Sequence, residues 1–298
     1  MQISAGNTRI EIDDQGPAAA EPLLLIMGLG MQLTAWPEQL VQLLVARGFR
    51  VIRMDNRDAG LSQGFDHLGL PNLAWAGARY TLRLKVRAPY SLDDMAGDAL
   101  GVLDALGLPR AHVCGASLGG MVAQHLAARQ PQRVASLTLM MTTAGARHLP
   151  QPSVRVRAAL LSRPASAAPA DVVAHLQRVL AIIGSPGYVT PPDEQASRLR
   201  AMVARAWRPA GTVRQLAAVL ADGDRSALLA RITAPTRVIH GNNDPLIPVA
   251  AGIDLAARIA GAVTDLIPGM GHDLPTALLE RFADGIRANA DRARAAVP

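Results

Sequence analysis

Three side chains that lie far apart in the sequence have the types and settings needed for nucleophilic chemistry: Ser117, Asp244 and His272. Ser117 stands in Gly115-Ala116-Ser117-Leu118-Gly119, after a short apolar run and before a helical pattern. In that strand–turn–helix context the G-x-S-x-G pattern has a mechanism, because the tight turn strains the backbone of the serine and requires glycine on both sides. Ser117 is therefore predicted to be a nucleophile held above a sheet at the positive end of a helix.

A serine hydroxyl needs a base to remove its proton, and histidine suits this role because its ordinary pKa lies near neutrality. Of the seven histidines, His272 is predicted to be the base, because two glycines in Gly269-Met270-Gly271-His272 let the loop curl over the sheet. His240 ends a strand-like run, and both a structural role and a supporting role beside the site stay open. The remaining histidines are assigned to a strand, a helix, loops or the region 142–233: His67, His112, His125, His148 and His175.

The imidazole also needs an acid that fixes its tautomer and stabilises the imidazolium. Asp244 is predicted to be this acid, because it follows the run Arg237–His240 and gives the chain order Ser, Asp, His. An aspartate before a proline is also typical of an Asx turn, so that structural role stays open for Asp244. Asp273 is not expected to reach the ring of its own neighbour, and Asp222 and Asp224 fall within 142–233.

Attack on an ester produces an oxyanion, which backbone N–H groups can stabilise. Leu118, directly after the nucleophile, is predicted to supply one donor, and the loop Met27-Gly28-Leu29-Gly30-Met31 a second, from Leu29. This loop is also a glycine turn between a strand and a helix, and that structural role does not exclude the first. Gly28, Met31 and Met121 are predicted to contact the substrate, because apolar and flexible side chains around the site favour an apolar pocket.

The elements that must position these residues follow a repeating rhythm. Six short apolar runs, each closed by a turn and followed by a helical pattern, are typical of a mainly parallel sheet buried on both faces. The segments Gln2–Asn7 and Arg9–Asp13 predict a hairpin on its edge, and residues Leu92–Leu106 and Ser117–Arg129 predict two helices. The six runs are Leu23–Met27, Phe49–Met54, His112–Cys114, Leu137–Met141, Arg237–His240 and Val263–Ile267.

The strand rhythm stops between residues 142 and 233, where prolines separate short helical patterns. We interpret 142–233 as a helical cap inserted into a core made of 1–141 and 234–298. Its amphipathic patterns predict helices at Ala170–Ile183 and Glu194–Ala206, with His175 on a polar or intermediate position. Residues 142–232 hold twelve arginines against five carboxylates, which predicts a solvated helical surface or, as an alternative, a surface that steers anionic substrates.

The composition of the chain limits the binding partners and the cellular location that we expect for it. The net charge is +6, yet aromatic residues make up 3%, so nucleic-acid binding is not expected. Cys114 is the only cysteine and no secretion signal or spanning segment is apparent, which favours the cytoplasm and no stable membrane insertion. Neither a metal ion nor an organic cofactor is expected. The partner is a small-molecule substrate, and a homo-oligomer is left open.

Five motifs together resemble the α/β-hydrolase superfamily: Leu24–Gly30, Arg53–Ser62, Gly115–Gly120, His240–Pro245 and Gly269–His272. Within it the chain looks like the esterase branch that includes aclacinomycin methylesterases. The resemblance spans residues 20–141 and 232–285 and implies an α/β fold with a mainly parallel eight-stranded sheet, flanking helices and an inserted helical cap. This sequence departs from the family at two places. Met27 stands where many relatives have histidine, which removes a polar side chain beside the oxyanion loop. Asp58-Ala59 replaces a common glycine-rich turn and is expected to alter the rim of the pocket.

The expected activity is that of a carboxylesterase, which cleaves small to medium apolar esters through an acyl-enzyme. A serine nucleophile argues against haloalkane dehalogenases and epoxide hydrolases of similar fold, which use a carboxylate. Lactonase, thioesterase, carbon–carbon hydrolase and cofactor-free perhydrolase or haloperoxidase activities use the same triad and stay open. So does a receptor that binds a hydrophobic ligand without turnover.

Overall fold

A computed structural model describes residues 1–295. Its centre is one sheet of eight strands: β1 (Gln2–Ala5), β2 (Thr8–Gln15), β3 (Glu21–Ile26), β4 (Phe49–Met54), β5 (Ala111–Ala116), β6 (Val134–Met140), β7 (Thr236–Gly241) and β8 (Val263–Ile267). Their order is β1-β2-β4-β3-β5-β6-β7-β8. The edge hairpin β1–β2 and the pair β2–β4 are antiparallel, and the other five pairings are parallel. The predicted mainly parallel eight-stranded sheet with an edge hairpin is confirmed.

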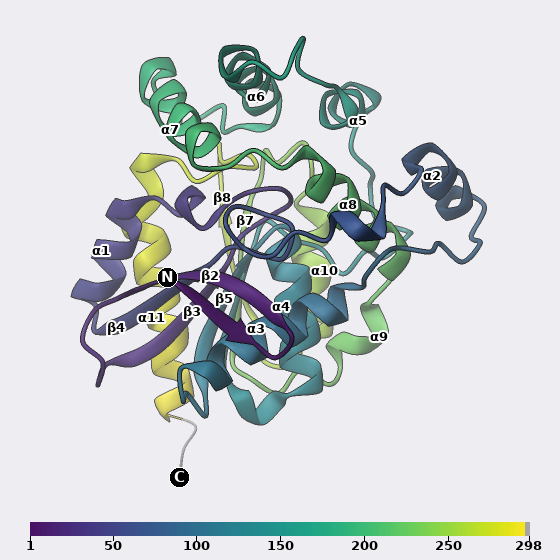
Figure 1. Ribbon diagram of the computed structural model, residues 1–298. Helices are drawn as coiled ribbons and strands as arrows, with labels where there is room; N and C mark the ends of the chain where they lie inside the picture. Colours follow the sequence, from purple (N-terminus) through teal and green to yellow (C-terminus); the bar gives the residue numbers. More distant parts are fainter. Residues whose placement is uncertain (296–298) are drawn as a thin grey trace.

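Helices cover both faces of this sheet (Figure 1). Two of them, α1 (Glu38–Ala46) and α11 (Leu279–Ala295), pack together on one face. The opposite face is covered by α3 (Leu92–Ala105), α4 (Leu118–Arg129) and α10 (Ala250–Arg258). The predicted helix at 92–106 is confirmed as α3. It begins with a reciprocal capping box between Ser91 and Asp94 and is followed by Gly107 at a φ of 66°.

The central strands have apolar side chains on both faces because each face has its own core. In β3, Leu24 and Ile26 belong to the core beneath α3 and α4, whereas Leu23 and Leu25 belong to the core beneath α1 and α11. Successive side chains of a strand point to opposite faces, so a strand covered on both sides needs an unbroken apolar run. This is why the runs in the sequence could be interpreted as buried strands.

Five helices connect β6 to β7: α5 (Val154–Leu161), α6 (Pro169–Ile183), α7 (Pro192–Arg205), α8 (Pro209–Asp222) and α9 (Ser226–Leu229). Helices α6 and α7 match the two predicted ones with slightly different ends, and Figure 1 shows them with α5 above the sheet. They share a small apolar cluster that includes Val172, Leu199 and Met202. Helix α8 contacts α3 and a further helix that was not predicted, α2 (Leu73–Thr81). The division into core and cap stays a prediction.

The predicted polar or intermediate setting of His175 is wrong. Its exposed fraction is 8%, because α6 packs against α7 on one side and against α5 on another. Burial lowers the pKa of the His175 imidazole, and the nearby Arg178 lowers it further.

No helix within residues 1–295 is long and apolar enough to cross a membrane.

Candidate active site

Ser117 occupies the turn between β5 and α4, with a backbone φ of 53° and ψ of −120°. A residue with a side chain rarely adopts this conformation, which costs about 1–3 kcal/mol and persists only where its surroundings enforce it. Here the Ser117 amide donates to the carbonyl of Met140, 2.9 Å away, and the Ser117 carbonyl accepts from Thr142 Oγ1 at 2.7 Å. The end of β6 therefore holds the strained turn from both sides.

The two glycines that flank Ser117 are required by close contacts, as the sequence predicted. A Cβ atom on Gly119 would lie 2.0 Å from the carbonyl oxygen of Ile26, and one on Gly115 would lie 2.3 Å from the carbonyl oxygen of Gly119. Both distances are far below contact distance. The first turn of α4 can pack this tightly against β3 only without side chains at these positions.

The structure brings Ser117, Asp244 and His272 together at the carboxyl ends of β5, β7 and β8. His272 Nε2 lies 3.0 Å from Ser117 Oγ, and His272 Nδ1 lies 2.7 Å from Asp244 Oδ2. Since an ionised carboxylate accepts hydrogen bonds, the proton of the neutral ring belongs on Nδ1. That tautomer leaves the lone pair of Nε2 directed at the serine hydroxyl.

Asp244 makes the contacts that both interpretations of its sequence setting require. Its Oδ1 accepts from the amides of Leu246 and Ile247 at 2.9 and 2.8 Å, which is an Asx-type turn, and its Oδ2 faces His272. The turn fixes the carboxylate with one oxygen and leaves the other for the imidazole. The structural and the chemical interpretations are therefore compatible.

His240 lies against this pair without touching Ser117. Its Nε2 donates to the carbonyl of Ile247 at 2.8 Å and lies 3.7 Å from Asp244 Oδ2. The ring is fully buried, and burial lowers its pKa although the neighbouring Asp244 raises it. A neutral His240 therefore packs behind the acid, beside α10, where the position of Gly252 leaves room for the ring.

Two backbone amides in the segments beside Ser117 have no acceptor among residues 1–295. The Leu118 amide is in the first residue of α4 and so has no intrahelical acceptor. In the loop after β3, the Gly30 amide donates to Gln215 Oε1 and the Met31 amide to the Gly28 carbonyl, whereas the Leu29 amide donates to no acceptor within residues 1–295. A Cβ on Gly28 would lie 3.2 Å from Ser117 Cβ, so this loop passes beside the nucleophile.

Contacts from α6 to the His272 loop were not anticipated from the sequence. The His272 amide donates to the carbonyl of Ile183 at 2.7 Å, and the Gly271 amide donates to Ser185 Oγ at 2.8 Å. The Ser185 hydroxyl in turn donates to Asp273, whose pKa is raised by burial although Ser185 lowers it. Asp273 does not contact the imidazole, as expected, but it holds the residue that supports the loop.

The loop after β4 connects the core to α7 and α8. Asp55 Oδ2 accepts from Arg205 of α7 at 2.8 Å, and Asp58 accepts two hydrogen bonds from Arg214 of α8 at 2.8 and 2.7 Å. The exposed fraction of Asp58 is 1%. This side chain is committed to Arg214 and to Tyr90 Oη, 2.8 Å away, and an effect of Asp58 on the rim of the pocket stays a prediction.

A cavity of about 200 Å³ has none of the three residues in its lining, but it is lined by residues that contact two of them. Met121, whose amide donates to the Ser117 carbonyl, lines it together with Leu246 and Ile247, whose amides bind Asp244. Of the predicted substrate contacts, Met121 is thus at the cavity wall and Gly28 beside Ser117. Met31 packs between the core and the cluster of α6 and α7.

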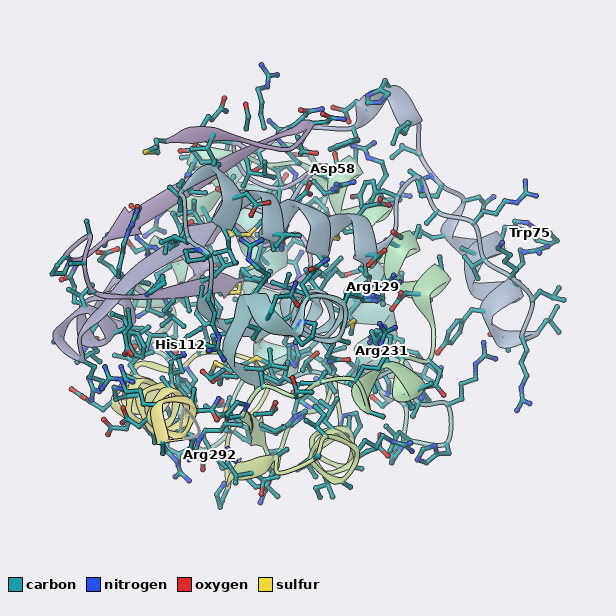
Figure 2. All side chains as sticks on the ribbon, turned by 90° about the horizontal axis from the view of Figure 1, so that it is seen from below. Asp58, Trp75, His112, Arg129, Arg231 and Arg292 are labelled. Carbon is teal, nitrogen blue, oxygen red and sulfur yellow. The ribbon has the colours of Figure 1, made fainter. Side chains whose placement is uncertain are left out.

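Other histidines are engaged in pairs away from the site. His125 Nε2 lies 2.9 Å from Asp222 Oδ1. His112 Nδ1, labelled in Figure 2, lies 2.9 Å from Ser136 Oγ. Asp222 also contacts Arg225. Across residues 1–295, His, Cys, Asp and Glu side chains form no group of three or more that could hold a metal ion.

Comparison with known proteins identifies the family of this chain. A family model described as the alpha/beta hydrolase fold matches residues 21–275. The rhodomycin D methylesterase DauP of Streptomyces sp. (strain C5) is 33% identical over 297 residues, with 92% of each chain covered. A 2-hydroxy-6-oxononadienedioate/2-hydroxy-6-oxononatrienedioate hydrolase of Cupriavidus pinatubonensis is 30% identical, covering 91% of this chain and 88% of the relative. Among solved structures, the meta-cleavage product hydrolase from Pseudomonas fluorescens IP01 superposes with a TM-score of 0.76 at 20% identity, covering 98% of both chains.

Proposed function

This chain belongs to the α/β-hydrolase family, and we propose that it is a carboxylesterase that cleaves small to medium apolar esters with Ser117 as the nucleophile. One observation carries the proposal. His272 Nε2 lies 3.0 Å from Ser117 Oγ while its Nδ1 lies 2.7 Å from Asp244 Oδ2. Both distances are within hydrogen-bond reach, which is the geometry that nucleophile, base and orienting acid require.

In the first half-reaction, Ser117 Oγ attacks the ester carbonyl carbon and its proton passes to His272 Nε2. The Asp244 carboxylate stabilises the imidazolium through the proton on Nδ1. The negative charge that develops on the carbonyl oxygen is bound by the amides of Leu29 and Leu118, worth about 2.7–4 kcal/mol per donor in a comparable site. His272 then returns the proton to the leaving alcohol as the carbon–oxygen bond breaks, which leaves Ser117 acylated.

In the second half-reaction, water replaces the alcohol. His272 Nε2 removes one proton from the water as its oxygen attacks the acyl carbon, and the same two amides bind the second oxyanion. Collapse of that intermediate releases the carboxylic acid and returns the proton to Ser117 Oγ. Both halves use the same groups, so one geometry serves acylation and deacylation.

The substrate class is proposed from the surroundings of the triad. None of the three residues lines the cavity, but Met121, whose amide bonds to the Ser117 carbonyl, does. The apolar side chains of this cavity support an apolar acyl or alcohol group: Met121, Leu149, Leu246, Ile247, Pro248 and Ala251. Similarity to a rhodomycin D methylesterase supports methyl esters as members of this class. The helices α5–α9 of residues 142–233 are proposed to be the cap that selects among them.

Turnover of p-nitrophenyl acetate and butyrate, compared between the unchanged chain and Ser117→Ala, tests the proposal. We expect steady turnover that Ser117→Ala abolishes, and labelling of Ser117 by a phosphonate reagent. A panel of methyl esters, a lactone and 2-hydroxy-6-oxononadienedioate then ranks substrates. Labelling at another residue with loss of activity would contradict the assignment, and saturable binding of esters without turnover would favour a receptor.

A further inference from the structure

Large apolar side chains are exposed mainly in two segments of this molecule. Of the twelve that are exposed within residues 1–295, eight lie in residues 68–84 and 154–161, so their exposure is concentrated rather than scattered. The largest is Trp75 of α2, with an exposed fraction of 62%, and Figure 2 shows it pointing away from the rest of the protein. The eight are Leu68, Leu70, Trp75, Leu82, Leu84, Val154, Leu160 and Leu161.

The same two segments are strongly cationic. No carboxylate occurs between Asp66 and Asp93 or between Asp104 and Asp171. Seven cations lie in residues 68–87 and 154–163, which we call the α2–α5 face: Arg79, Arg83, Lys85, Arg87, Arg155, Arg157 and Arg163. None of the seven forms an ion pair within residues 1–295, whereas arginines elsewhere, such as Arg47, Arg50 and Arg214, do.

The two segments belong to one side of the molecule. Tyr80, near the end of α2, stacks under the guanidinium of Arg147 at 4.9 Å, and Arg147 lies in the chain that leads into α5. Tyr80 also lines the same cavity as Leu149–Pro152 of that chain. In Figure 1, α2 and α5 are both outermost elements of the same upper corner.

We propose that the α2–α5 face adsorbs to the surface of an anionic lipid bilayer. Its arginines would bind lipid phosphates, while Trp75, Leu82 and the neighbouring apolar side chains enter the headgroup region. Tryptophan suits this depth because its ring is amphipathic. Adsorption is peripheral, so it requires no spanning helix.

Charge complementarity favours this occupant over the alternatives. A second copy of the chain would place seven unpaired cations against seven, which opposes self-association through this face. An acidic protein would satisfy the cations, but it would not account for eight exposed apolar side chains interleaved among them on two separate segments. A fluid anionic surface accommodates both kinds of side chain at once.

Co-sedimentation with vesicles tests the proposal without depending on the proposed activity. The unchanged chain is expected to sediment with equimolar phosphatidylglycerol–phosphatidylcholine vesicles and much less with pure phosphatidylcholine. Removing three exposed cations in Arg83→Gln/Lys85→Gln/Arg87→Gln should lower partitioning about a hundredfold at low salt. The pair Trp75→Ser/Leu82→Ser should also weaken binding and abolish a blue shift of the fluorescence of Trp75.

Matched variants distinguish this face from general attraction by charge. Arg9→Gln/Arg110→Gln/Arg231→Gln removes the same charge from exposed sites elsewhere, and Val189→Ser/Ile253→Ser removes two exposed apolar side chains elsewhere. Both should bind vesicles nearly as well as the unchanged chain. Equal loss in face and matched variants, no binding to anionic vesicles, or unchanged binding by Trp75→Ser/Leu82→Ser would overturn the proposal. So would a dimer in size-exclusion chromatography that only the face variants dissociate.

Discussion

The hydroxyl of Ser185 accepts a hydrogen bond from the amide of Gly271 at 2.8 Å, although 86 positions separate the two residues. The same hydroxyl donates to Asp273, and Ile183, the last residue of α6, offers its carbonyl to the His272 amide at 2.7 Å. The loop that carries the imidazole is therefore held on both sides of His272 by the last residue of α6 and by Ser185, two residues beyond it. The position of the base depends on α6.

Ser185→Ala tests this dependence. Loss of the support should misplace His272 and lower kcat about tenfold, because a buried hydrogen bond is worth about 1–2 kcal/mol. KM should change little, because Ser185 acts through the position of His272. Ser185→Thr should restore most of kcat, since it keeps the hydroxyl. Steady-state kinetics on a p-nitrophenyl ester measures both. Ser162→Ala, at an exposed serine that bonds only to its own turn, is the matched control. An unchanged kcat in Ser185→Ala would reject the dependence.

Asp244→Asn is expected to lower kcat by orders of magnitude, about 10⁴ in the protease precedent, because the amide favours the wrong tautomer of His272. The side-chain carbonyl of the introduced asparagine can still accept from Leu246 and Ile247, so the turn and the melting temperature should change little. Single-turnover kinetics with circular dichroism separates the two effects. Asp273→Asn, at the residue directly after His272, should leave far more activity. Near-normal turnover in Asp244→Asn would assign the acid to another residue.

Arg214→Met leaves the buried carboxylate of Asp58 without its cation and should lower the free energy of unfolding by about 3–5 kcal/mol. The double variant Asp58→Asn/Arg214→Met should recover part of this loss. Urea denaturation at pH 7 measures both.

The pH dependence of the unchanged chain gives a further check on the Asp58–Arg214 pair. Burial raises the pKa of Asp58, but the hydrogen bonds from Arg214 and others lower it more, so the net pKa lies below its ordinary value. The stabilisation is therefore present above the ordinary pKa of an aspartate and is lost as pH falls through the folded value. If Arg214→Met were as stable as the unchanged chain, that result would contradict this account of the Asp58–Arg214 pair.

The buried His112 should make stability depend on mild acid. Burial lowers its pKa to about 4, against 6.5 for an ordinary histidine, although the nearby Glu21 raises it. Between these values the unfolded chain binds the proton and the folded chain does not, so stability rises with pH across this window, by about 3 kcal/mol.

His112→Asn removes that titration and should flatten the profile between pH 4 and 6.5, measured by urea denaturation at several pH values. The matched control is His67→Asn, because His67 is exposed. Equal slopes in His112→Asn and the unchanged chain would show that another group dominates acid unfolding.

Local patterns were sufficient to predict the sheet. Phe49–Met54 and Val263–Ile267 coincide with β4 and β8, and the other four runs differ from their strands by at most three residues at an end. A strand buried on both faces is apolar along its whole length, so it shows in the sequence alone. The glycines around Ser117 were predictable for a similar reason, since a tight turn leaves a local signature.

Long-range polar contacts left no such signature. Gln215 binds Gly30 across 185 positions, and Arg214 binds Asp58 across 156. Nothing in the residues beside either partner indicates the other, because Arg214 and Gln215 are ordinary polar residues on a helix and Gly30 and Asp58 lie in turns. The buried setting of His175 was missed for the same reason, since the packing of α6 against both α5 and α7 depends on how the helices assemble.

Asp55 and Asp58 are only three positions apart, yet one binds the last turn of α7 and the other the middle of α8. Any segment transplanted between β6 and β7 from another protein must therefore present a cation opposite each of these two aspartates. A graft that lacked either cation would bury an unneutralised charge in the recipient scaffold. A chimera that exchanges specificity should therefore keep Arg205 and Arg214 of this chain and replace other residues. Alternatively, the grafted segment should supply an arginine at each of these two positions.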